Sequence, residues 1–178
     1  MHMSNLKPMT DIISNDANAS RSTVIANLDA LAEWVGKEVA VGDWMPIDQA
    51  RIQAFAEVTE DLQWIHLDVD RCERESPYHA PIAHGYLVLS LLPAMFASNV
   101  RIDGLAMSVN YGLDRVRFPA PVIAGKRVRG RLALEQLKQV ADCMQAQWLA
   151  TVEVEGGCKP VCVAQVLARY YPKTEAKP

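Results

Sequence analysis

The sequence lacks several features that mark whole classes of protein. It has four cysteines in 178 residues, and no two of them form a C-x-x-C pair. Cys158 and Cys162 are separated by three residues across an expected turn and strand, a spacing that argues against zinc, so we expect no metal. The net charge is -3. Without an overall basic excess, we expect no nucleic-acid partner.

Long apolar segments are also missing. The first residues contain no apolar core of a signal peptide. No apolar run reaches the roughly 18 residues that a membrane span requires. The best candidate, residues 86–100, is shorter and is interrupted by a proline and by polar residues. We therefore expect a cytoplasmic protein with free thiols and no membrane partner.

The composition predicts one globular domain behind a leader. Half of the residues are hydrophobic, which is enough for one buried core at this length. Residues 1–22 are rich in Ser, Asn, Asp and Thr, and we expect a flexible leader there. Residues 23–178 should form a single domain with an added N-terminal helix. That helix should cover residues 27–35, with Asn27 as its N-cap and Gly36 at its end.

Helical spacing appears twice more before the pattern changes. Residues 47–58 predict a helix capped by Asp48. Residues 59–81 have little periodicity and two prolines, and we expect a long loop there; such loops are often functional. Residues 85–99 are apolar on nearly every face, which predicts a long helix buried on nearly every side.

The second half of the chain has the pattern of a sheet. Four segments are long, alternating or rich in β-branched residues, and turn signals separate them. We expect antiparallel strands at residues 108–118, 127–137, 144–154 and 161–171. One buried helix followed by four such strands is an α+β layout.

Two short motifs carry the candidate chemistry. Asp61 and His66 lie in the segment EDLQWIHLD on the expected loop. A carboxylate and an imidazole on one loop can share a water, so that one group removes its proton while the other donates a proton to a substrate. Gly85 follows His84 at the start of the apolar helix and has no side chain, so a ligand can approach its backbone. Its N–H at a helix N-terminus would suit an oxyanion hole for a thioester.

Each motif also has a purely structural interpretation. A loop Asp–His pair is commonly a local hydrogen-bonded or solvated pair. The glycine can be a steric accommodation. A basic cluster around the first long strands can bind an anionic ligand or form a solvated face. Its members are Arg115, Arg117, Lys126, Arg127, Arg129 and Arg131.

A family resemblance joins these motifs. FAEVTEDLQWIHLD, followed after about fifteen residues by PIAHGYLVLSLL, resembles the MaoC-like dehydratases, also called (R)-specific enoyl-CoA hydratases. The sequence is most similar to the NodN-like branch, because Gln63 and Trp64 replace the usual Asn-Pro and NYGLDRVRFPAPV follows. The resemblance covers residues 39–170, about three quarters of the chain.

The resemblance implies a fold, a reaction and roles. The fold would be a hot dog, a long central helix wrapped by a curved antiparallel sheet, in a homodimer or higher homo-oligomer. Asp61 and His66 would be the catalytic pair, and the Gly85 N–H would polarise the thioester carbonyl. The reaction would be reversible syn hydration of a trans-2-enoyl-CoA to an (R)-3-hydroxyacyl-CoA, without a cofactor. The candidate substrate contacts are Trp64, His84, Arg115, Arg117, Lys126 and Arg127.

Two other functions fit the same fold. Hot-dog acyl-CoA thioesterases commonly place Asp or Glu on the central helix, and short acyl-carrier-protein dehydratases place a Glu there. Residues 85–100 contain no carboxylate, which counts against both. A non-catalytic acyl-binding protein is the remaining alternative, and the complete set of Asp61, His66 and Gly85 argues against it.

Overall fold

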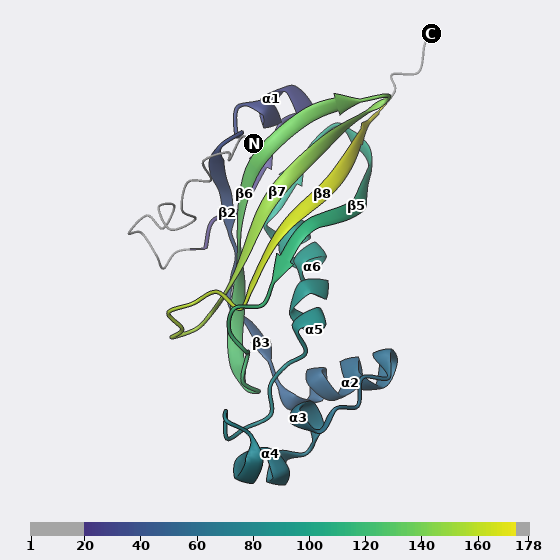
Figure 1. The fold of residues 1–178 in the computed structure, drawn as a ribbon. Helices are drawn as coiled ribbons and strands as arrows, with labels where there is room; N and C mark the ends of the chain where they lie inside the picture. Colours follow the sequence, from purple (N-terminus) through teal and green to yellow (C-terminus); the bar gives the residue numbers. More distant parts are fainter. Residues whose placement is uncertain (1–19, 174–178) are drawn as a thin grey trace, which may run out of the picture.

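The computed structural model describes residues 20–173, and a curved antiparallel sheet dominates it (Figure 1). The four predicted strands are confirmed as β5 (Leu105–Arg117), β6 (Lys126–Val140), β7 (Cys143–Val154) and β8 (Cys162–Pro172). The sheet order is β2-β6-β7-β8-β5, and the short β3 also pairs with β6. Two shorter strands precede them in the chain, β2 (Lys37–Val41) and β3 (Met45–Ile47).

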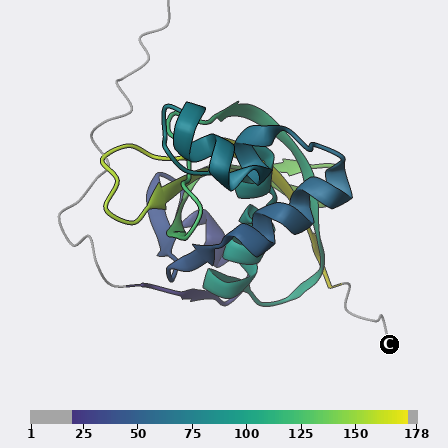
Figure 2. The same cartoon turned by 90° about the horizontal axis from the view of Figure 1, so that it is seen from below.

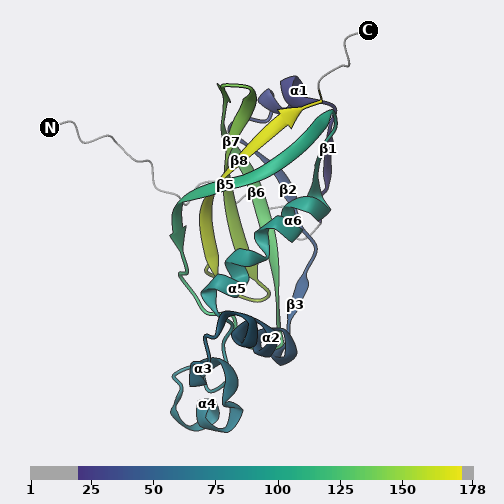
Figure 3. The same ribbon diagram turned by 90° about the vertical axis from the view of Figure 1, so that its right-hand side faces the viewer.

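One face of this sheet forms the core. Alternate residues of β8 are buried because successive side chains of a strand point to opposite faces. The central helix lies against the sheet (Figure 3). Phe96 of this helix meets Trp148 edge to face, with ring centroids 5.2 Å apart. The indole N–H of Trp148 donates to the Tyr170 hydroxyl at 2.9 Å. This buried polar group is therefore satisfied.

The central helix differs from the prediction in continuity. It is divided into α5 (Gly85–Ser90) and α6 (Leu92–Asn99), with Leu91 between them. Pro93 lies in the first turn of α6 and has no N–H to donate to the preceding turn. A proline is tolerated at such a helix start. The helix therefore breaks at the point where Pro93 cannot donate the next backbone hydrogen bond.

The prediction that this helix is buried on nearly every side is wrong. Only one stripe is buried, and it includes Leu87, Val88, Leu92 and Met95. The side chain of Tyr86 is 70% exposed, and Pro93, Ala94, Ala97 and Ser98 are exposed as well. The sheet covers one side of the helix, and no second layer of the described residues covers the other.

The expected loop at residues 59–81 is partly helical, so that prediction is also wrong. Asp48 caps α2 (Gln49–Thr59) as predicted, accepting from the Arg51 N–H at 2.8 Å. Two short helices follow, α3 (Trp64–Leu67) and α4 (Val69–Glu75). They are too short to produce a clear hydrophobic period. Together with α2 they lie across the lower end of the sheet, near the start of α5 (Figure 2).

The N-terminal part of the domain adds α1 (Leu28–Ala32), with Asn27 as its N-cap as predicted. The unpredicted strands β1 (Thr23–Ile25) and β4 (Val100–Ile102) form a parallel pair. Most of the expected leader, residues 1–19, lies outside the described residues. In the described part of this segment, Arg21 forms an antiparallel β-bridge with Val41. Within residues 20–173, no helix combines the length and the apolar character needed to cross a bilayer.

Candidate active site

Three side chains converge at the end of the sheet where the short helices lie. Asp61 follows α2, His66 lies on α3 and His84 immediately precedes α5. One carboxylate oxygen and one nitrogen of each ring all lie within 4.8 Å of one another. The structure thus brings together Asp61 and His66, as their spacing in the sequence predicts. It also adds His84 to them.

The hydrogen bonds of His66 define which of its ring nitrogens can act as a base. The His66 side chain is buried, with Nδ1 2.6 Å from the Ile82 carbonyl oxygen. A carbonyl only accepts, so Nδ1 carries the proton and Nε2 is the basic nitrogen of the neutral ring. Gln49 Nε2 donates to the His66 carbonyl at 2.7 Å and holds the backbone of α3.

The surroundings of His66 favour the neutral imidazole. Burial lowers the pKa of His66 below its ordinary 6.5, and the nearby His84 lowers it further. The hydrogen bond to Ile82 and the Asp61 carboxylate act in the opposite direction but are outweighed. At neutral pH the ring is therefore ready to accept a proton.

His84 is the most enclosed member of the group. Its side chain is 2% exposed, and Nε2 lies 3.0 Å from the main-chain oxygen of Asp61 and 4.0 Å from a carboxylate oxygen. Its ring stacks on His66 with centroids 3.7 Å apart, and Phe55 packs beside it at 5.1 Å. Its Nδ1 is buried and has no hydrogen-bond partner among the described residues.

This geometry does not fit a metal ion shared by the two imidazoles. A metal binds in the plane of each ring, about 2 Å from the nitrogen. The planes of His66 and His84 are inclined by only 27° and their centroids are 3.7 Å apart. Two such planes meet too far away for one ion to lie in both. The cluster instead suits hydrogen bonding and proton transfer.

Gly85 lies next to this cluster as the first residue of α5. Its N–H makes no hydrogen bond to any of residues 20–173, so it is available at the helix start. A Cβ at this position would lie 2.9 Å from Cδ2 of Phe118. The space left by the missing side chain is therefore occupied by an aromatic ring of the protein itself. The sequence offered no signal for this contact.

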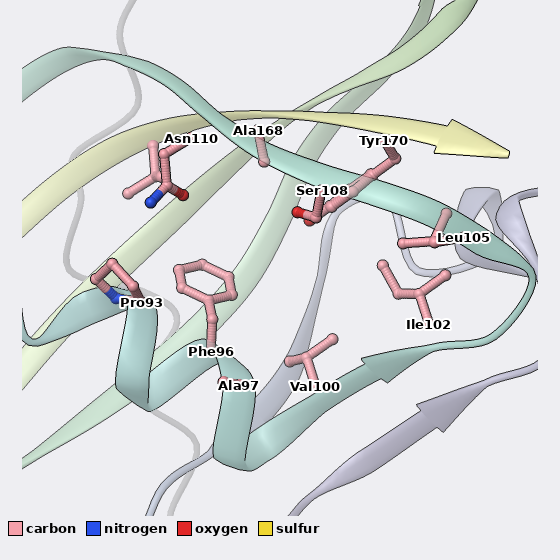
Figure 4. A pocket seen from close by; sticks show the side chains of 11 residues that line it. Pro93, Phe96, Ala97, Val100, Ile102, Leu105, Ser108, Asn110, Ala168 and Tyr170 are labelled. Carbon is pink, nitrogen blue, oxygen red and sulfur yellow. The ribbon is translucent and has the colours of Figure 1, made fainter.

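Two pockets lie along the central helix. One, of about 280 Å³, adjoins Gly85 and is bordered by Tyr78, Phe118 and aliphatic side chains, together with exposed main-chain polar groups. The other, also about 280 Å³, lies between α6 and β5, where Phe96 faces a wall that contains Ser108 and Asn110 (Figure 4). None of Asp61, His66 and His84 lines either pocket.

The basic cluster is divided by its ion pairs. Three of its arginines are bound to carboxylates: Arg127 to Glu155, Arg129 to Glu153 and Arg131 to Glu38. Arg115, Arg117 and Lys126 are exposed and have no ion pair with the described residues. Among the other candidate contacts, the ring of Trp64 is covered by the Arg71 guanidinium, 4.2 Å from its centroid.

Comparisons with known proteins agree with the fold and the sequence motifs. Residues 31–156 match the family model described as MaoC like domain. The 3-hydroxyacyl-thioester dehydratase Z of Mycobacterium tuberculosis is 42% identical over 141 residues, 79% of this chain and 93% of that protein. Nodulation protein N of Rhizobium meliloti is 39% identical over 155 residues, 85% and 96% of the two chains. The unliganded R-hydratase of Pseudomonas aeruginosa superposes with a TM-score of 0.64 at 22% identity, over 81% and 90% of the chains, and so shares the hot-dog fold.

Proposed function

Because the chain belongs to the MaoC-like domain family, we propose that it catalyses the reversible syn hydration of a trans-2-enoyl-CoA to an (R)-3-hydroxyacyl-CoA. The observation that carries this proposal is the convergence of the Asp61 carboxylate and the His66 imidazole within 4.8 Å. A relative 42% identical to this chain bears the name of a 3-hydroxyacyl-thioester dehydratase, which supports the same reaction in reverse.

The geometry supports a simple sequence of proton transfers. Water lies between the Asp61 carboxylate and Nε2 of His66. His66 takes one proton as the water oxygen bonds to C3, and the electrons of the double bond move toward the thioester carbonyl. The Gly85 N–H donates to the resulting enolate oxygen. The imidazolium then returns its proton to C2 from the same face, which makes the addition syn and restores neutral His66.

An assay with crotonyl-CoA distinguishes this function from its alternatives. We expect the enoyl-thioester absorbance to fall without release of a free thiol, and chiral analysis to find the (R)-hydroxy product. A thioesterase would release CoA thiol instead. A non-catalytic acyl-binding protein would bind the thioester and change neither signal. Thiol release, or no turnover at all, would refute the proposed function.

The pH dependence follows from the pKa of His66. The neutral ring is the base, and burial lowers its pKa below 6.5. The neutral form therefore persists as the pH falls past 6.5, and kcat/KM should decline only below that value. A pH series of kcat/KM for crotonyl-CoA measures this acid limb. An acid limb centred above pH 7 is incompatible with His66 as a buried neutral base.

We also propose that the protein is a homodimer formed along β5. This strand is at one edge of the sheet, and only β8 pairs with it among the described strands. An open edge of such length presents unpaired backbone groups. It also exposes four large apolar side chains: Met107, Val109, Tyr111 and Leu113. A second copy would cover both the edge and these side chains.

Light scattering at micromolar protein should give a mass of at least twice 19.7 kDa. Val109→Lys combined with Leu113→Lys should shift the protein toward monomer, because it places two charges on the exposed apolar surface. Val58→Lys is the matched control, since Val58 is 85% exposed on α2, away from β5. A monomeric wild type, or an unaltered dimer in the double variant, would contradict the β5 interface.

For the anionic CoA moiety we propose Arg115 and Arg117 as phosphate contacts. Both are exposed, and Arg117 immediately precedes Phe118, whose ring packs on Gly85. Replacing both with Gln should raise the KM for crotonyl-CoA and leave kcat nearly unchanged, since remote phosphate contacts bind ground and transition states alike. The wild-type KM should rise with salt.

The matched control replaces two exposed lysines remote from this pair, Lys37 on β2 at the opposite edge of the sheet and Lys138 near the far end of β6. It removes the same amount of charge, so a change of KM common to both double variants would indicate a general field effect. A KM that stays constant in the Arg115/Arg117 variant across the salt series would place CoA elsewhere.

We place the protein in the cytoplasm. All four cysteines are free, and three of them are buried in the domain. Free thiols are typical of a reducing compartment. This fits a substrate that is itself a CoA thioester.

A further inference from the structure

His84 is a buried imidazole that the proposed reaction does not use. At 2% exposure its ring has almost no surface to offer a substrate. Its Nε2 lies 3.0 Å from the main-chain oxygen of Asp61. Because a carbonyl oxygen can only accept a hydrogen bond, Nε2 carries the proton. Its ring face lies on His66. One side chain therefore contacts both members of the catalytic pair.

Fold stability alone does not explain an imidazole at this place. The Nδ1 atom is buried without a hydrogen-bond partner among residues 20–173. A buried unpartnered acceptor destabilises a fold relative to an apolar ring of similar shape. Phe55, with its ring centroid 5.1 Å away, would accept such a ring. The imidazole must supply something that a phenyl ring cannot, and its single polar contact is with Asp61.

The turn that carries Asp61 needs an external support. Glu60, immediately before it, ends α2 with φ of 60°, a left-handed conformation that is unfavourable for a residue other than glycine. The Asp61 side chain is 53% exposed and has no hydrogen bond of its own to the described residues. The hydrogen bond from His84 Nε2 is thus the main polar contact between this turn and the buried core.

We infer that His84 is a positioning residue that holds the Asp61 turn through its Nε2–H and aligns the His66 ring by stacking on it. This inference rests on the proposed hydration. His84 acts on the two groups that handle the water and does not reach the thioester. Its loss should therefore lower kcat and leave KM nearly unchanged, because a shift of about 1 Å in a catalytic group can cost about 10²-fold in rate.

Two substitutions separate the hydrogen bond from the ring. His84→Phe keeps a flat ring against His66 but removes the donor, and kcat for crotonyl-CoA should fall by about 10² with KM within about twofold. In His84→Gln the side-chain amide Nε2 can donate to the Asp61 carbonyl oxygen, and kcat should stay within about tenfold of wild type. His79→Gln is the matched control, because His79 is exposed and should leave both constants unchanged.

The pH profile gives a readout that a merely structural role would not move. The groups that act on His66 are His84, Asp61 and the Ile82 carbonyl, and of these His84 lowers its pKa. Both His84 variants should therefore shift the acid limb of kcat/KM to higher pH. Thermal melts check that the variants are folded. Should His84→Phe not fold, nitrogen NMR of the wild-type histidines still tests the inference, which requires the Nε2–H tautomer of His84.

The outcomes distinguish this inference from the proposed function. Wild-type kcat and an unmoved acid limb in folded His84→Phe overturn the positioning role, while wild-type hydration of crotonyl-CoA leaves the function intact. Equal losses in His84→Gln and His84→Phe overturn the hydrogen bond as the cause. An Nδ1–H tautomer in the wild type overturns it as well. Absence of hydration by the wild type refutes the function itself.

Discussion

Asp61→Asn is expected to lower the turnover of crotonyl-CoA by about 10² or more. The asparagine amide is nearly the same size, but it has no charge with which to orient the water and stabilise the imidazolium of His66. The melting temperature should stay near wild type, because the Asp61 side chain is 53% exposed and contributes little to packing. Initial rates and a thermal melt on the same preparation measure both effects.

The partner substitution and a matched control complete this test. His66→Gln should cause a comparable loss, since it removes the basic Nε2 that takes the proton from water in the proposed reaction. Asp70→Asn removes a charge from another exposed aspartate, on nearby α4, and should retain wild-type turnover. Full activity of Asp61→Asn would show that the carboxylate is not part of the reaction.

The second large effect is expected at Gly85. Gly85→Val should lower turnover by at least the 10²–10³ that is typical for loss of one oxyanion donor, because the side chain would separate the N–H from the thioester. The structure adds a second obstacle, since even a Cβ would lie 2.9 Å from the ring of Phe118. Measured rates for Gly85→Val alone cannot separate these two causes.

A double variant separates them. Phe118→Ala leaves the Gly85 amide in place and frees the space beside it, because the Phe118 ring supplies all three of the closest contacts. If the side chain blocks the thioester, Gly85→Val with Phe118→Ala should remain as inactive as Gly85→Val. Recovery of activity in the double variant would assign the loss to the displaced ring. Wild-type activity of Gly85→Val would remove Gly85 from the mechanism.

The parts of the fold that were predictable share one property: each repeats its pattern over many residues. The four long strands alternate between two faces, and α2 combines a helical period with a capping Asp48. Where an element is short, this information is absent. The three-residue strands β1 and β4 and the four-residue α3 were missed for that reason.

Burial of the central helix was predicted wrongly because an apolar composition favours burial but does not determine which faces are covered. Whether a face is covered depends on which elements reach it, and here the sheet reaches one side. The sequence pattern is therefore consistent with the exposed side chains of α5 and α6 and with the exposed apolar residues of β5. They mark surfaces that the described chain does not cover by itself.

By itself, the sequence determined the elements with long repeats and the proximity of Asp61 and His66, since these two residues are only five positions apart and a short segment must bring them near each other. Only the tertiary structure decided how His84 and Phe118 take part. His84 meets Asp61 across 23 positions of the chain, and Phe118 reaches Gly85 from the end of a strand. Contacts of this kind depend on how separate elements pack together, and no local pattern in either segment encodes them.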